Sequence, residues 1–163
     1  MQVEIVKILS GLCANFYTVK IDGDSLTLFE KFISENKSKY NNELNNIRDR
    51  LKVMSDRTGA RETFFKINEG VPGDGVCALY DDPDKKLRLY CVRYGTVVVI
   101  LGSGGEKTKN IKALQESKKL TKENELVKRI SKGVTNAFKE KYLRWTLDKT
   151  DIECDDDEMI IEI

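Results

Sequence analysis

The run from Val97 to Leu101 constrains the fold of this 163-residue chain more than any other feature. It is continuous, apolar and mostly β-branched, and it follows Thr96 directly. Such a run is typical of a strand that is buried on both faces, whereas a strand with one wet face alternates. It is far shorter than the roughly 20 apolar residues of a membrane span. Glu4 and Lys7 interrupt the apolar N-terminus, which disfavours a signal peptide, so we expect a cytoplasmic protein without a membrane partner.

The rest of the chain shows apolar residues in two patterns, one at the spacing of helices and one typical of strands. Apolar residues at helical spacing predict a first helix around Phe29–Ile33, a second from about 38 to 55, and a last one that begins at Thr121. Strand patterns cover 2–9, 13–21, 62–67, 77–80, 86–94 and 96–101. Because these strands follow one another through short turns, we expect a small antiparallel sheet with a helical pair on one side and a C-terminal helix. This α+β arrangement would form a single domain over residues 1–163.

The glycine-rich segment 102–109 (GSGGEKTK) follows the apolar strand and could bind phosphate in a P-loop. That motif requires glycine where this chain has Leu101 and Glu106, and a carboxylate at the second position would repel phosphate. We therefore expect a flexible glycine turn that leaves the strand.

The absence of histidine limits the chemistry. It excludes Ser-His-Asp and Cys-His triads and removes the usual general base near neutral pH. The four cysteines are far apart and form no C-x-x-C pair, so we expect reduced thiols, no metal site and no cofactor.

Charge is unevenly distributed along the chain. The C-terminal tail, residues 151–163, holds seven acidic residues and no basic one. The other residues hold 28 basic and 20 acidic side chains, so the body is net basic by 8 and suits a phosphate-bearing partner. The tail could fold over the basic surface, or its DEMIIEI sequence could form an edge strand.

The stretch from Leu87 to Lys109 resembles the central hairpin of the RelE/HigB-type toxins, including their phage-derived relatives. Its strand of the form L-R-x-x-x-x-R, its apolar second strand and its basic run carry the likeness. The late helix, with ELVKRISKGV, also resembles the closing helix of that family. The resemblance covers roughly residues 25–140. The N-terminal strand pair and the acidic tail would be additions to a RelE-like domain.

The resemblance implies a metal-independent endoribonuclease (an mRNA interferase) that cleaves ribosome-bound mRNA and pairs with a cognate antitoxin. The residues that it implies for catalysis are Arg88, Arg93, Lys107, Glu106 and Tyr94. The arginines and Lys107 would stabilise charge on the phosphate, and Glu106 or Tyr94 would move protons.

Lys86, Lys109 and Lys66 would bind RNA. One geometric point bears on this set. Arg88 and Arg93 are five residues apart, so ideal alternation places them on opposite faces of a strand. A non-catalytic module that binds RNA or protein is the alternative function.

Overall fold

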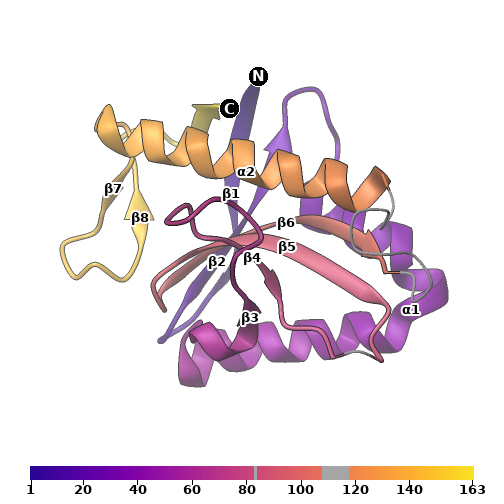
Figure 1. Cartoon of the computed structure of the whole chain (residues 1–163). Coiled ribbons are helices and arrows are strands. Elements are labelled where there is room, and N and C mark those ends of the chain that lie inside the picture. The colour runs from indigo at the N-terminus through magenta and orange to yellow at the C-terminus, as the bar shows by residue number, and fades with distance from the viewer. Residues whose placement is uncertain (83, 108–117) are drawn as a thin grey trace.

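The structure, a computed structural model, describes residues 1–82, 84–107 and 118–163. Its centre is a seven-stranded mixed sheet in the order β3-β4-β5-β6-β2-β1-β9, with helix α1 on one face and helix α2 on the other (Figure 1). The helices are α1 (Leu28–Val53) and α2 (Lys118–Lys139), with short turns η1 (Met54–Thr58) and η2 (Glu62–Phe64) after α1. The strands of the sheet are β1 (Gln2–Ser10), β2 (Asn15–Ile21), β3 (Phe65–Lys66), β4 (Val76–Leu79), β5 (Leu87–Tyr94), β6 (Val98–Glu106) and β9 (Met159–Glu162). A separate two-stranded sheet pairs β7 (Arg144–Trp145) with β8 (Ile152–Glu153).

The expected fold class, a small antiparallel sheet with a helical pair on one side, is wrong. Strands β2 and β6 run parallel at the centre of the sheet, in a register from Asn15 opposite Val98 to Thr18 opposite Leu101. Through this pairing the apolar strand β6 is hydrogen-bonded on both edges, to β2 and to β5. Because β2 is parallel to β6 and β5 is antiparallel, the sheet is mixed. Because both faces of the enlarged sheet are apolar, each one requires a covering helix.

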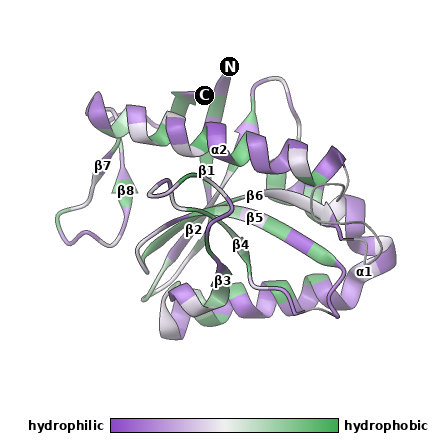
Figure 2. Ribbon diagram, viewed as in Figure 1, coloured by the Kyte–Doolittle hydropathy of each residue, from purple (hydrophilic) through white to green (hydrophobic). Residues whose placement is uncertain are grey.

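Two hydrophobic clusters, one on each face, hold these layers together. The side chains of β6 alternate between them: Val98 and Ile100 pack in the cluster under α2, whereas Val99 and Leu101 pack in the cluster against α1. The apolar stripes of both helices face the sheet and their polar residues face outward (Figure 2). The continuous apolar run is thus explained by burial on both faces, as expected.

In place of the expected helical pair the chain forms one element, α1, in which two helical segments meet at a kink. Helix α1 begins after Thr27, which forms a capping box with Glu30, and it runs to Val53. At Tyr40 the backbone leaves the helical region, with φ −128° and ψ 36°. The two apolar stripes in the sequence therefore belong to two segments that join at Tyr40 instead of separating at a loop.

The glycine-rich segment also differs from expectation. Residues up to Glu106 continue β6, and Gly102 to Gly105 are buried in it. A Cβ atom on Gly104 would lie 1.7 Å from the carbonyl oxygen of Arg88 on β5. Glycine is present because the two backbones approach closely, not because the chain turns. Thr108 and Lys109 lie outside the described residues.

The acidic tail forms an edge strand, as one of its two sequence interpretations predicted. Strand β9 pairs antiparallel with β1, with Val3 opposite Ile161, and the two chain termini lie side by side (Figure 1). Before it, the β7–β8 hairpin is anchored by Trp145, which stacks on Phe138 and meets Tyr94 edge-on. No helix in the described ranges is long and apolar enough to cross a membrane.

Candidate cationic site around Asp81

Three of the cationic residues singled out by sequence meet at one buried carboxylate. The carboxylate of Asp81 is only 4% exposed, and Lys66 Nζ lies 2.5 Å from its Oδ1. Lys107 Nζ forms an ion pair with Oδ2, and Arg88 Nε lies 3.6 Å from the same oxygen. Lys107 and Arg88 are themselves only 12% and 16% exposed. We call these four residues the Asp81 cluster.

Neighbouring strands bring the cluster together at one end of the sheet. Lys66 lies on β3 opposite Ala78, and Asp81 follows β4 by two residues. Arg88 is paired with Gly105 near the start of β5, and Lys107 follows the last residue of β6. The main-chain N–H of Lys107 donates to the carbonyl of Lys86 at 2.6 Å, which extends this pairing by one step.

The cations decide the ionisation of Asp81. Burial by itself would raise the pKa of the Asp81 carboxyl, because a low-dielectric site disfavours the charged form. The ammonium groups of Lys107 and Lys66 and the charge of Arg88 outweigh burial, so this pKa lies below its usual value. Asp81 is therefore an anion at neutral pH, and it holds three cations close to one another.

The sequence analysis did not identify Asp81 as a site residue. Its only distinguishing mark in the sequence is that it follows the apolar strand and Tyr80 directly. Nothing in that position indicates that three basic side chains from other strands converge on it.

Glu106 lies at the same end of the sheet, on the side of α1. Its carboxylate accepts hydrogen bonds from the Tyr40 hydroxyl and from Lys39 Nζ, the latter at 3.3 Å. The hydrogen bond from Tyr40, followed by that from Lys39, holds the pKa of Glu106 below its usual value. The irregular backbone at Tyr40 thus coincides with a contact to a predicted site residue.

Arg93 does not join the Asp81 cluster. Its Nε donates to the carbonyl of Ala60 at 2.7 Å, and its guanidinium carbon lies 5.9 Å from the centre of the Phe65 ring. Phe65 belongs to the cluster on the α1 face, whereas the Arg88 neighbour Tyr90 packs under α2. The two arginines lie on opposite faces, as the strand period predicts.

Tyr94 is also remote from Asp81. It packs against Trp145 on the α2 side, and its buried hydroxyl has no hydrogen-bond partner among the described residues. Burial, together with the nearby charge of Asp74, raises the pKa of its phenol well above the usual value. At neutral pH this group stays a protonated phenol, which is a poor proton donor and has no populated phenolate to act as a base.

Lys86 and Lys109 are the two remaining residues predicted to bind RNA, and only Lys86 can be placed relative to the Asp81 cluster. Lys86 lies beside the cluster, directly before β5, where its main-chain N–H donates to the Glu43 carboxylate at 2.8 Å. Lys109 lies outside the described residues. The structure therefore brings together Lys66, Arg88 and Lys107, with Glu106 and Lys86 at the same end of the sheet.

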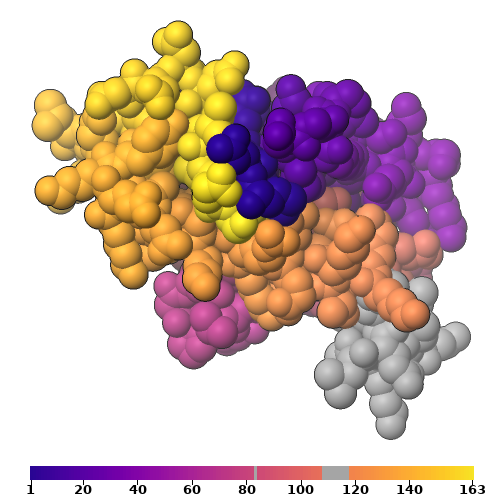
Figure 3. All heavy atoms as spheres, turned by 90° about the horizontal axis from the view of Figure 1, so that it is seen from above, coloured from indigo at the N-terminus to yellow at the C-terminus, as the bar shows by residue number. Residues whose placement is uncertain are grey.

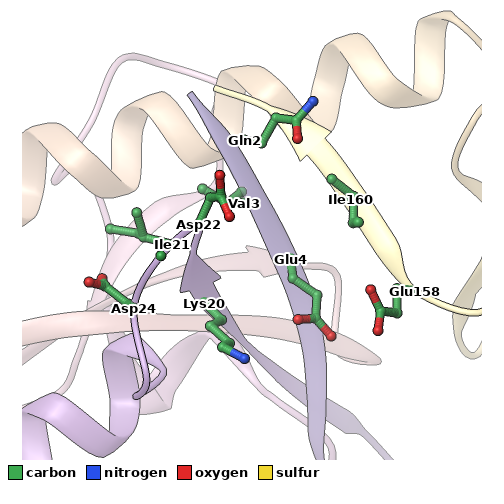
Figure 4. Close-up of a pocket in the computed structure, with 10 residues that line it drawn as sticks. Gln2, Val3, Glu4, Lys20, Ile21, Asp22, Asp24, Glu158 and Ile160 are labelled. Carbon is green, nitrogen blue, oxygen red and sulfur yellow. The ribbon is translucent and has the colours of Figure 1, made fainter.

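A separate hollow of about 200 Å³ lies at the far side of the sheet, between β1, the end of β2 and β9 (Figure 4). Four carboxylates line it, those of Glu4, Asp22, Asp24 and Glu158, against the single cation Lys20. This excess of negative charge opposes phosphate binding. None of the residues predicted for the site lines it.

Comparisons of the chain with protein-family models, curated proteins and solved structures found no significant match. Within residues 1–82, 84–107 and 118–163, no group of three or more cysteine or acidic side chains is arranged to hold a metal ion. A function is therefore inferred from the geometry and the sequence of this chain.

Proposed function

We propose that this chain is a ribosome-associated, metal-independent endoribonuclease that cleaves mRNA and acts as the toxin of a toxin–antitoxin pair. One observation carries the proposal, namely that Lys66, Arg88 and Lys107 converge on Asp81. The sequence resemblance of Leu87–Lys109 to RelE/HigB-type toxins supplies the substrate class. The fold expected from that resemblance plays no part in the argument.

The charge of the Asp81 cluster suits a phosphoryl transition state. Three cations and one carboxylate leave a net charge of +2. A phosphodiester carries one negative charge, and the phosphorane formed when the ribose 2′-OH attacks phosphorus carries two. The cluster therefore compensates the transition state more fully than the ground state, which is the condition for catalysis.

Each residue has a distinct role in this scheme. Arg88 and Lys107 donate hydrogen bonds to the non-bridging phosphate oxygens, and Asp81 positions them by holding their cationic groups together. Glu106 is ionised at neutral pH, and it takes the proton of the attacking 2′-OH. The new O2′–P bond forms as the P–O5′ bond breaks, and the departing O5′ takes a proton from solvent water, while Glu106 later returns the 2′-OH proton to solvent. The products are a 2′,3′-cyclic phosphate and a 5′-OH.

The test is mRNA cleavage in a translating extract, with cut sites mapped by primer extension. We expect wild type to cut ribosome-bound message, and Arg88→Ala and Lys107→Ala to cut it about 100-fold more slowly, the usual loss for one charge-stabilising donor. Lys132→Ala, which removes an exposed lysine of α2, is the matched control and should cut at the wild-type rate. Arg93→Ala should retain most of the rate in the molecules that stay folded.

A message left intact by wild type, with and without ribosomes, rejects the endonuclease. Equal rates for wild type, Arg88→Ala and Lys107→Ala would instead place the active site elsewhere. Thermal melting of each variant separates a lost rate from a lost fold.

A second candidate function is RNA binding without cleavage. It is favoured by the positions of Arg93 and Tyr94, because two of the five implied catalytic residues lie away from the Asp81 cluster. This candidate predicts that wild type binds single-stranded RNA but leaves it intact. Binding should then weaken with added salt and with Lys107→Ala, which fluorescence anisotropy measures directly.

A further inference from the structure

A second pocket opens where β3 stops pairing with β4. Only two residue pairs join these strands, Phe65 with Leu79 and Lys66 with Ala78. Beyond them the chain diverges, and a hollow of about 300 Å³ lies between the loop 67–75 and the strands β4 and β5. Its lining includes Ile67, Asn68, Val71, Pro72, Cys77 and Arg93. None of the four residues of the Asp81 cluster lines this pocket.

The loop that forms the pocket is held in shape by its own contacts. The Asp74 carboxylate accepts hydrogen bonds from the main-chain N–H groups of Val71 and Val76, both at 2.9 Å. Ser131 Oγ of α2 donates to the Asp74 carbonyl at 2.6 Å, so the loop is fastened to the helix, and it protrudes beside α2 (Figure 3). Gly73 and Gly75 supply the positive φ values, 86° and 73°, that the turn requires. A ligand would therefore bind without first having to order the loop.

Arg93 gives the pocket a fixed cationic group. The hydrogen bond from its Nε to Ala60 and the ring of Phe65 hold the guanidinium in place. In the part of the chain that the structure describes, no carboxylate forms an ion pair with Arg93. A guanidinium has five N–H donors, and a carboxylate or a phosphate can accept from two of them at once.

The rim of the pocket is apolar and open to solvent. Ile67 is 49% exposed and Val71 is 65% exposed, and Pro72, directly before Gly73, is exposed as well. A ligand that fits this surface needs an apolar group to pack on the exposed aliphatic side chains and a negative charge to pair with the pre-oriented guanidinium.

We propose that this pocket is a docking site for an extended acidic–apolar segment of a partner protein. One apolar side chain of the segment packs on Ile67 and Val71, and a neighbouring carboxylate pairs with Arg93. The N–H donors that Arg93 keeps beside its bond to Ala60 support a carboxylate as the partner group. The one carboxylate in the lining, Asp74, already accepts hydrogen bonds from the N–H groups of Val71 and Val76. An RNA backbone fits less well, since it carries a phosphate at every nucleotide and the pocket offers one lining cation beside an apolar rim.

The probe is a fluorescent 12-residue peptide of alternating leucine and glutamate, and the measurement is fluorescence anisotropy with the full chain. A peptide with glutamine in place of glutamate tests the charge, and a 12-nucleotide single-stranded RNA tests the other class of ligand. Val71→Glu changes an exposed loop side chain, so it should leave the fold intact, and Arg93→Gln removes the guanidinium. Leu147→Glu, at a fully exposed position of the β7–β8 loop, is the control for an equal change elsewhere.

We expect wild type to bind the glutamate peptide at least about tenfold more tightly than the glutamine peptide, as the loss of a charged hydrogen-bond partner predicts. Val71→Glu and Arg93→Gln should each weaken binding about tenfold or more, and Leu147→Glu should stay within about twofold of wild type. Amide NMR shifts on titration should concentrate between Ile67 and Cys77 and at Arg93. The proposal is wrong if the glutamate peptide does not bind, or binds equally to wild type and Val71→Glu. It is also wrong if the RNA binds and only the RNA loses affinity in Arg93→Gln.

Discussion

Asp81 shows how a buried charge is retained when its neighbours compensate for it. Moving a carboxylate out of water is unfavourable by several kcal/mol, and the penalty is recovered only with close counter-charges. Lys66, Arg88 and Lys107 provide these counter-charges from three other positions in the sheet. Removal of the carboxylate would leave three cations close together with nothing between them.

We therefore predict that Asp81→Asn lowers the free energy of unfolding by on the order of 3 kcal/mol at pH 7. Because the folded pKa of Asp81 lies below its ordinary value of 3.8, its contribution is full above that value and is lost as pH falls through the folded pKa. The difference between wild type and Asp81→Asn should thus shrink below about pH 4. Urea unfolding at pH 7, 4 and 3 measures both effects.

Asp24→Asn is the control for this experiment. Asp24 pairs with Lys31, but both side chains are about one-third exposed, so the pair should contribute less than about 1 kcal/mol. If Asp81→Asn is as mild as Asp24→Asn at pH 7, the Asp81 cluster is not the tightly coupled unit described above.

At this scale the sequence predicted part of the site. Local strand period correctly separated Arg88 from Arg93, because alternation depends only on neighbours in the chain. The meeting of Lys66 with Lys107 depends on which strands pair, and their separation of 41 residues leaves no local trace. Tyr94 was assigned a role in proton transfer because the sequence does not reveal that its ring is buried beside Trp145.

At the scale of elements, the glycines of β6 act by their lack of a side chain. Gly102 lies where a Cβ atom would meet Val127 of α2 at 2.4 Å, and Gly104 presses against the β5 backbone. A bulge between Leu89 and Cys91 accompanies this close approach. Glycine therefore helps to set the position of Arg88, since the contact at Gly104 is with the Arg88 carbonyl.

Gly104→Ala should unfold the protein at a markedly lower temperature, with a loss of several kcal/mol, because overpacking against a backbone atom cannot be relieved by a rotamer change. Gly105→Ala is a matched control on the adjacent residue. Its Cβ would meet the flexible Lys119 side chain at 3.4 Å and Leu120 at 3.6 Å, both at the distance of ordinary contact, so we expect a change within about 0.5 kcal/mol. Differential scanning calorimetry of the two variants gives the comparison, and similar melting temperatures would contradict the close packing.

The sequence located most strands and the antiparallel pairs β1–β2 and β5–β6, but not how these two pairs join in one sheet. The apolar and alternating patterns of residues 2–9, 86–94 and 96–101 correspond to β1, β5 and β6, with boundaries shifted at the glycines. The parallel pairing of β2 with β6 escaped prediction because the two strands are joined through α1 and a three-strand excursion. A glycine run is also ambiguous, since flexible turns and closely packed strands select the same residue.

At the scale of the whole molecule, positive and negative charge lie at opposite sides of the sheet. The Asp81 cluster includes residues of β3 and β5, whereas the acidic tail ends in β9 at the other edge. From β5 the sheet crosses β6, β2 and β1 before it reaches β9, four steps of roughly 4.8 Å, or about 19 Å. That separation exceeds the Debye length of about 8 Å at physiological salt.

The tail should therefore influence RNA binding only weakly, and we predict this for the variant Asp155→Asn, Asp156→Asn, Asp157→Asn. These residues precede β9 and are mostly exposed, so the triple change raises the net charge by three without altering the strand. RNA affinity at about 150 mM salt should rise less than about threefold, and the gain should grow as salt falls and screening weakens. Anisotropy titrations of single-stranded RNA across a salt series measure this, with Lys107→Ala as the reference for a change inside the cluster. A tenfold gain at physiological salt would mean that the tail reaches the cationic site in solution and competes there with RNA.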